Sequence, residues 1–345
     1  MSDIHENPLA CPDCKTLLAR SASVATCSDC GRTFPSESGV ACFNRDKALH
    51  GEFTREEMSE LLEFVREQGW KSAVENYIRP RRPDVVQLLR DERRSNFRSL
   101  LGLNGSERVL DIGCGFGGIS LQLSKRVAQV VAIDNTYERV SFLDLVAAEE
   151  GYENLIPVCN GDILRLPLAS NYFDAVCLIG VFEYLPVDMP DRTPEDVFSG
   201  TLGEIRRVLK PGGALYLGTK NRFGSPYIKG EADHNGLRFG PLLPRPLADV
   251  LCRTLRGKPY RIILHSLRGY RKLLHDAGFA PIEAYWPSPG YQYPDRFIDL
   301  GENARTLAEA AGGSPAKSAL VSILGAIGVL PHVVPFFGFV ARKSV

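Results

Sequence analysis

Apolar and polar positions along the chain follow two periods, one typical of buried strands and one typical of amphipathic helices. Short apolar runs predict strands near residues 108–112, 129–134, 155–159, 173–179, 213–219, 281–286 and 333–342. Stretches with apolar residues at helical spacing separate most of these runs. Because strands that alternate with helices form a parallel sheet with helices on its faces, the pattern predicts an α/β fold with seven strands.

Helical spacing also precedes the first predicted strand. Residues 54–78 predict two or three helices, and a further helix is expected over 85–101. We expect three parts: a small N-terminal module over 1–46, a helical lead-in and possible lid over 47–100, and the main α/β domain over 101–345. Long Gly- and Pro-rich stretches near 220–262 and 288–332 are expected to form caps, because loops of this length in a compact domain are usually functional.

Composition narrows the classes of function. The chain has 345 residues, 44% of them hydrophobic, which suffices for a substantial core. Lys plus Arg and Asp plus Glu both number 41, so the net charge gives no global attraction to nucleic acid or anionic lipid. The N-terminus lacks the pattern of a secretory signal, and no clean apolar run reaches transmembrane length. We therefore expect a cytoplasmic protein; the oligomeric state is left open.

A glycine cluster follows the first strand of the main domain, in the stretch VLDIGCGFGGIS over residues 109–120. Gly113, Gly115 and Gly118 match the G-x-G-x-x-G pattern of nucleotide-binding turns, which NAD enzymes share. Asp111 decides between cofactors, because its carboxylate would repel the pyrophosphate of NAD and attract the cationic methionine end of S-adenosylmethionine (SAM). Asp134 ends the next strand, about 20 residues on, where a carboxylate can take ribose hydroxyls.

Four motifs in order resemble the class I SAM-dependent methyltransferases: VLDIGCGFGG, VVAIDNT, GDILRLPLASNYFDAVCLIGVFEYLP and EIRRVLKPGGALYLGTKNR. The resemblance implies a Rossmann-like seven-stranded sheet and SAM as cofactor. It places Asp111, Gly113, Gly115 and Gly117 at the methionine end, Asp134 at the ribose, Asp162 with Ile163 at the adenine, and Phe182 as a wall after the fourth strand. A Rossmann-like domain that binds NAD or nothing is the alternative.

Four cysteines form two C-x-x-C pairs near the N-terminus, Cys11 with Cys14 and Cys27 with Cys30. Two such pairs supply the four thiolates of a tetrahedral structural zinc. The segment resembles zinc-ribbon activators of tRNA and translation-factor methyltransferases, and the zinc-bearing N-terminus of a bacterial rRNA guanine methyltransferase. Reduced cysteines without metal, or disulfides, are the alternatives.

Candidate acceptor residues lie after the fourth strand and on the first cap. His234 is the candidate general base, because the pKa of histidine suits proton transfer at neutral pH. Glu183 and Tyr184 are candidate acceptor contacts; the family frequently has histidine where this chain has Tyr184.

The leading hypothesis is O-methylation of a small-molecule or saccharide-type acceptor in bacterial natural-product or glycan biosynthesis. The second is an rRNA or tRNA methyltransferase whose ribbon grips RNA, although charges within residues 11–30 balance. The third is a non-catalytic scaffold with a methyltransferase fold.

Overall fold

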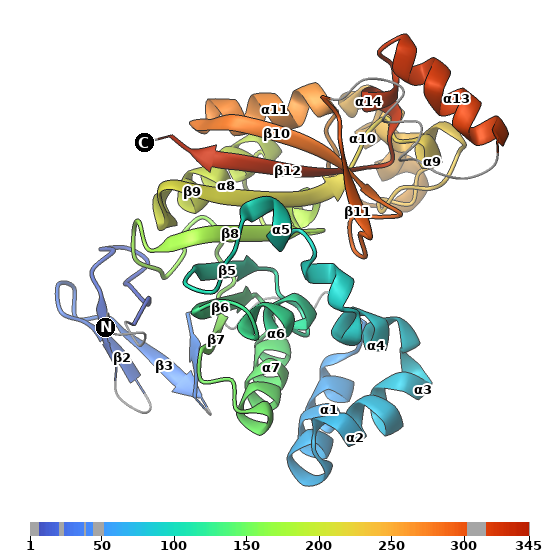
Figure 1. Ribbon diagram of the computed structural model, residues 1–345. Helices are drawn as coiled ribbons and strands as arrows, with labels where there is room; N and C mark the ends of the chain where they lie inside the picture. Colours follow the sequence, from blue (N-terminus) through green and yellow to red (C-terminus); the bar gives the residue numbers. More distant parts are fainter. Residues whose placement is uncertain (1–6, 21–23, 38, 44–51, 302–314, 345) are drawn as a thin grey trace. The chain divides into compact units, whose positions relative to one another are not determined.

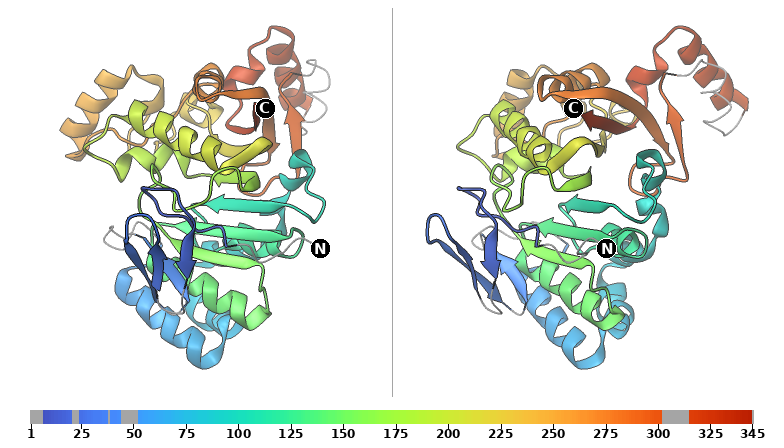
Figure 2. Two further views of the ribbon diagram at one scale, coloured as in Figure 1. Left: turned by 90° about the vertical axis from the view of Figure 1, so that its left-hand side faces the viewer. Right: turned by 60° about the vertical axis from the view of Figure 1, so that its left-hand side comes forward.

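The computed structural model describes residues 7–20, 24–37, 39–43, 52–301 and 315–344. The chain divides into two compact units (Figures 1 and 2). Unit 1 comprises Met1–Cys177 with Arg207–Ala214, and unit 2 comprises Leu178–Arg206 with Leu215–Val345. Two strands, β8 (Phe173–Ile179) and β9 (Leu209–Lys220), begin in unit 1 and end in unit 2. The predicted three-part division of the chain stays a prediction.

Unit 1 is built on parallel strands whose apolar runs are buried on both faces. β5 (Arg108–Ile112), β6 (Gln129–Asp134) and β7 (Leu155–Cys159) pair in parallel in the order β7-β6-β5. All six residues of β6 are buried. Such two-sided burial explains why these strands read as continuous rather than alternating apolar runs.

The N-terminal module joins this sheet. Strands β1 (Leu18–Arg20), β2 (Val24–Cys27), β3 (Thr33–Glu37) and β4 (Val40–Cys42) pair antiparallel in sequence order. β4 then pairs in parallel with β7, with Ala41 opposite Val158 and Cys42 opposite Cys159. The module therefore extends the edge of the sheet instead of forming a separate body.

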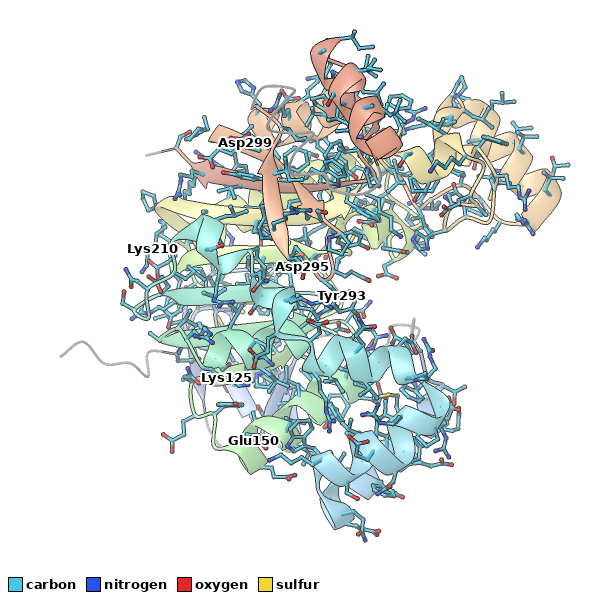
Figure 3. All side chains as sticks on the ribbon, turned by 45° about the vertical axis from the view of Figure 1, so that its right-hand side comes forward. Lys125, Glu150, Lys210, Tyr293, Asp295 and Asp299 are labelled. Atoms are coloured by element: carbon cyan, nitrogen blue, oxygen red, sulfur yellow. The ribbon has the colours of Figure 1, made fainter. Side chains whose placement is uncertain are left out.

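Helices cover the sheet of unit 1. α1 (Arg55–Gln68) begins with a capping box between Thr54 and Glu57 and buries Met58, Leu61, Leu62 and Val65 at helical spacing. It packs on α7 (Tyr137–Glu150). Glu150, labelled in Figure 3, accepts a hydrogen bond from Trp70 Nε1 at 2.9 Å, at the start of α2 (Trp70–Ala73). A π-helix (Val74–Ile78) and α3 (Arg79–Arg81) continue from α2.

The prediction of one continuous helix over residues 85–101 is wrong. The structure has α4 (Pro83–Arg90), a 3₁₀ turn (Glu92–Ser95) and α5 (Arg98–Leu101) instead. Asp91 interrupts the helix with extended backbone, and its side chain caps the next turn by accepting a hydrogen bond from the Arg93 amide at 3.1 Å. An aspartate that caps a new turn competes with continuing the helix.

Unit 2 continues the α/β pattern with antiparallel strands. β12 (Phe336–Lys343) and β11 (Arg296–Asp299) both pair antiparallel with β10 (Phe279–Ser288), and the order is β9-β12-β10-β11. Within the described residues, unit 2 contains a 3₁₀ segment at Phe182–Val187, α8 (Pro194–Val208, ending in unit 1), α9 (Ser225–Ile228), a 3₁₀ turn at Gly240–Leu242, α10 (Arg245–Arg256), α11 (Leu267–Asp276), α13 (Pro315–Ala326) and α14 (Leu330–Val333).

All seven expected core strands are present, and the Rossmann-like α/β prediction is confirmed. Two expectations differ in detail. The fifth strand begins at Leu209, four residues before the expected start at 213, and the last begins at Phe336, three residues after the expected start at 333. Part of the second predicted cap, residues 302–314, lies outside the described residues. Within the described ranges, no helix has both the length and the apolar content needed to cross a membrane.

Two glycines, one at the start of α6 and one in α8, provide a matched test of how tightly α6 packs against α4. A Cβ at Gly118, the first residue of α6 (Gly118–Ser124), would lie 2.0 Å from the Leu88 carbonyl oxygen. We expect Gly118→Ala to lower the free energy of unfolding by about 1–3 kcal/mol. Gly203 in α8 is exposed, and nothing lies within 4 Å of its Cβ position. Gly203→Ala should therefore raise stability by about 0.5–1 kcal/mol.

Urea denaturation of the two variants beside the parent chain measures both changes. A Gly118→Ala protein as stable as the parent would contradict the tight contact with α4.

Candidate functional site

The turn between β5 and α6 is the first predicted site. Gly113, Gly115 and Gly117 have φ values of 72°, 55° and 84°, in the left-handed region that glycine tolerates best. The amide of Gly113 donates to the Ile133 carbonyl at 2.7 Å, which ties the turn to β6. A Cβ at Gly117 would lie 2.2 Å from Leu143 Cδ1. At Gly115 nothing lies within 4 Å of the Cβ position, so the backbone there borders open space.

Two buried carboxylates flank this turn. Asp134 is 5% exposed; its Oδ2 accepts from the Gly115 amide and its Oδ1 from the Thr136 amide, each at 2.9 Å. Asp111 is 2% exposed and accepts from the Ser120 hydroxyl at 2.6 Å and the Cys177 thiol at 3.4 Å. Burial raises the pKa of Asp111 above its ordinary value, and the hydrogen bonds from Ser120 and Cys177 oppose this rise.

Asp162 and Ile163 lie on the loop that follows β7. The Asn160 amide donates to the Asp134 carbonyl oxygen at 2.9 Å, and its side chain donates to the Asp162 carbonyl oxygen at 2.8 Å. Asn160, 6% exposed, therefore connects the end of β6 to the predicted adenine residues. Ile163 is buried. Sequence reasoning missed Asn160, although its position directly after a buried strand was the available signal.

These residues of unit 1 fit SAM. The open space at Gly115 admits a ligand against the backbone, and the two buried carboxylates suit a ligand that carries cationic and hydroxyl groups. Phe182, the eighth predicted cofactor residue, belongs to unit 2. It is fully buried there, with its ring 4.7 Å from that of Phe198 and 6.3 Å from that of Tyr270. Its contact with the cofactor stays a prediction.

The three predicted acceptor residues come together within unit 2. The rings of Tyr184 and His234 lie 5.3 Å apart. His234 Nε2 contacts the ammonium group of Lys220, a residue that sequence reasoning missed because it lies at the end of β9, 14 residues away. Glu183 Oε2 accepts from the Thr219 hydroxyl at 3.1 Å, and Thr219 also contacts the Tyr270 hydroxyl at 3.0 Å. We call Glu183, Tyr184, Thr219, Lys220 and His234 the polar cluster.

Burial sets the protonation of the polar cluster. Glu183 is 0% exposed and burial raises its pKa; its Oε1 is buried and has no hydrogen-bond partner among the described residues. Burial lowers the pKa of Lys220, and the charge of Glu183 opposes this change. Partial burial and then the charge of Lys220 lower the pKa of His234 to about 4, although the residue is exposed in part. The imidazole is therefore neutral at physiological pH.

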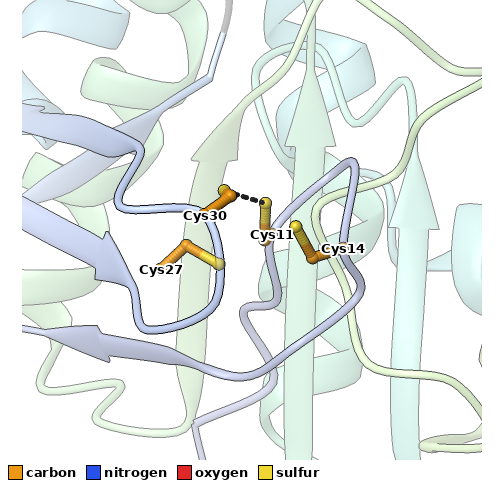
Figure 4. Close-up of side chains that lie close together, drawn as sticks. All are labelled: Cys11, Cys14, Cys27 and Cys30. Atoms are coloured by element: carbon orange, nitrogen blue, oxygen red, sulfur yellow. Dashed lines mark hydrogen bonds between the residues drawn. The ribbon is translucent and has the colours of Figure 1, made fainter.

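The four N-terminal cysteines converge at one point (Figure 4), with their sulfurs all within 4.8 Å of one another. Two equivalent turns bring them there. The Lys15 amide donates to the Cys11 carbonyl oxygen at 2.9 Å, and the Gly31 amide donates to the Cys27 carbonyl oxygen at 3.0 Å. Lys15 and Gly31 both have left-handed backbone, with φ of 61° and 70°. Each C-x-x-C pair thus sits on the same kind of knuckle.

The spacing of the sulfurs fits zinc. Zn–S bonds of about 2.3 Å in a tetrahedron separate the sulfurs by about 3.8 Å. Cys11 Sγ and Cys30 Sγ lie 3.8 Å apart, far beyond the length of a disulfide bond. Cys11, Cys14, Cys27 and Cys30 form no disulfide bond in this structure. Four thiolates leave no open position on the ion, so the donor set suits a structural metal.

Comparison with known proteins identifies the central part of the chain. Residues 110–217 match the family model described as "Methyltransferase domain". A sterol 24-C-methyltransferase of Neurospora crassa is 23% identical over 211 residues, which cover 58% of this chain and 50% of that protein. The Aspergillus fumigatus sterol 24-C-methyltransferase is 33% identical over 116 residues, 33% of this chain and 28% of that protein. The chain thus spans half or less of these two relatives.

Solved structures give a weaker likeness. A SAM complex of phosphoethanolamine N-methyltransferase 2 from Haemonchus contortus has a TM-score of 0.45 and 17% identity, covering 83% of this chain and 60% of that chain. A SAM-dependent methyltransferase from Methanosarcina mazei has a TM-score of 0.41 and 22% identity, covering 70% and 95%. The family match shows that residues 110–217 carry a methyltransferase domain.

Proposed function

We propose that this protein transfers a methyl group from SAM to a hydroxyl oxygen of a small-molecule or saccharide-type acceptor. SAM, when bound, supplies an electrophilic methyl carbon next to a positively charged sulfur. The protein's own task is to bind and orient the acceptor and to take its proton. The observation that carries the proposal is the polar cluster. In it the predicted acceptor residues lie together with Lys220; the imidazole of His234 is neutral and the pKa of Lys220 is lowered.

The Lys220–His234 pair is the proposed proton acceptor. As the new C–O bond forms and the C–S bond breaks, the hydroxyl proton of the acceptor passes to this pair. Burial lowers the pKa of both groups, and the imidazole of His234 is neutral at physiological pH. The contact with Lys220 occupies His234 Nε2, so the two side chains act as one unit. Glu183, with one oxygen unpartnered, is the proposed contact for a polar group of the acceptor.

Methylation of a carbon atom, which the names of the sterol 24-C-methyltransferases indicate for those relatives, is the competing candidate. The polar cluster favours a hydroxyl acceptor, because Lys220 and His234 have lowered pKa values and a hydroxyl group must lose its proton when it is methylated.

A labelling experiment tests the proposal. The purified protein is incubated with SAM labelled in its methyl group and with an extract of cells that make the protein. Label in the small-molecule or glycan fraction supports it. Label in a sterol fraction would replace it by carbon methylation, and label in RNA would replace it by RNA methylation. Failure to bind SAM at all would leave the scaffold hypothesis.

We further propose that Cys11, Cys14, Cys27 and Cys30 hold one structural zinc ion. Metal analysis of the purified protein should give one zinc per chain, and Cys14→Ser should abolish it because three thiolates bind the ion far more weakly. The matched control is Cys252→Ser, in α10 and outside the cluster. Zinc that is absent from the parent protein, or retained in full by Cys14→Ser, would contradict the site.

The role of His234 is tested by His234→Ala. Loss of the proton acceptor should lower kcat for the hydroxyl acceptor by about 100-fold or more, with SAM affinity unchanged. His275→Ala is the control, because His275 lies on α11 with its side chain 78% exposed. Steady-state kinetics and calorimetric titration with SAM give the two quantities. Unchanged turnover in His234→Ala would remove His234 from the mechanism.

Burial of Glu183 predicts a pH dependence of stability. Its folded-state pKa is raised above 4.5, so the folded state keeps a proton that the unfolded state has released. Stability contributed by this group therefore falls as pH rises from about 4.5 through the raised pKa. Glu183→Gln lacks this titration, and its stability relative to the parent should increase between about pH 5 and about pH 8. Urea denaturation at both pH values checks this.

Glu67→Gln, a change at an exposed residue of α1, serves as the control for the effect of pH on the rest of the chain. A stability difference between Glu183→Gln and the parent that stays constant with pH would show that Glu183 keeps its charge throughout.

A further inference from the structure

We infer that the cysteine module clamps the loop carrying Asp162 and Ile163, so that zinc binding raises the affinity of the protein for SAM. This inference rests on the proposed zinc site and on the proposed contact of this loop with SAM. All the contacts that carry it lie within unit 1.

The first contact is at the start of the loop. β4 of the module pairs in parallel with β7, and the Phe43 amide donates to the Cys159 carbonyl oxygen at 2.8 Å. Cys159 is the last residue of β7 and stands three positions before Asp162. The module therefore fixes the point from which the loop departs.

The second contact is at the end of the loop. The Ala10 amide donates to the Pro167 carbonyl oxygen at 3.0 Å, and the Ala169 amide donates to the Pro8 carbonyl oxygen at 2.9 Å. These two bonds flank an antiparallel bridge between Leu9 and Leu168, both 0% exposed. The segment from Cys159 to Ala169 is thus held at both ends by the module.

The zinc knuckle continues directly from this bridge. Cys11 follows Ala10 in the chain, and the Cys11 amide donates to the Thr16 carbonyl oxygen at 2.8 Å within the knuckle. From the same knuckle, Asp13 forms an ion pair with Arg165 on the loop at 2.9 Å. A module this small has too little apolar core to hold its shape without metal. Loss of the ion should therefore release the N-terminal end of the clamp.

A contact from outside the module limits how far the loss of zinc can loosen the loop. Arg207 donates to the carbonyl oxygens of Leu168 at 2.7 Å and Leu166 at 3.0 Å. The loop then keeps part of its shape without zinc. We expect weakened rather than abolished SAM binding, in the range typical of coupling between two sites, about 5- to 150-fold.

The test compares SAM affinity in zinc-loaded, zinc-depleted and zinc-restored protein by isothermal titration calorimetry. Zinc is withdrawn with a chelator, and circular dichroism checks that the α/β domain remains folded. Depletion should weaken SAM binding at least fivefold, and restoration should reverse the change. Because coupling between two ligands is reciprocal, SAM should tighten zinc binding by the same factor, measured by competition with the chelator.

A variant tests the clamp with zinc in place, which covers the case in which depletion unfolds the chain. Leu9→Ala removes a buried side chain at the bridge and leaves all four cysteines; it should weaken SAM binding while one zinc stays bound. Leu17→Ala, at a side chain 58% exposed in the same module, should leave SAM affinity unchanged.

The outcomes separate the proposals. Equal SAM affinity in Leu9→Ala and the parent, or in folded protein with and without zinc, overturns the clamp and leaves the proposed function standing. Zinc-loaded protein that does not bind SAM overturns both.

Discussion

The close approach of the chain at the start of α6 is the constraint on which the cofactor side of the molecule depends. Side chains at Gly117 and Gly118 would collide with Leu143 and with the backbone of Leu88. Glycine at both positions therefore lets α6 start in close contact with α7 and α4. That placement brings the Gly115 amide within 2.9 Å of Asp134 and leaves open space on its other side. The same glycines therefore meet two needs: the close packing of α6 and the geometry of the turn that is proposed to bind the cofactor.

A second requirement is met on the β7 side of the same sheet. A free edge strand offers unpaired backbone groups that invite association with other chains. Here β4 occupies the edge beside β7, so the cysteine module supplies backbone partners to the sheet. The dependence is mutual, because the module lacks a large core of its own and gains support from β7. The strands of the four-cysteine module thus extend the sheet of unit 1, to which the β-strands of the methyltransferase domain also belong.

The sequence was most informative where one physical requirement sets both the local residue pattern and the local structure. Strands such as β6 are buried on both faces, so their apolar runs are continuous and their ends were predicted closely. The cysteine pairs were equally clear, because two ligands on one knuckle need a fixed spacing. The helix over 85–101 was mispredicted, since Asp91 has the spacing of a helical residue but caps a new turn. Partners such as Lys220 for His234, and β4 for β7, arise from the fold and leave no local signal.

Glu183 is the residue whose placement is hardest to explain by stability alone. It is 0% exposed, one of its oxygens has no hydrogen-bond partner, and its charge is disfavoured by burial. Leaving a buried polar group unsatisfied costs about 1–3 kcal/mol, which an apolar residue at this position would avoid. The surroundings offset part of this cost through Thr219 and the nearby charge of Lys220. A ligand could supply the hydrogen bond that Glu183 lacks among the described residues, and Glu183 lies beside a lysine and a neutral histidine. This is the physical reason for proposing Glu183 as a contact for the acceptor.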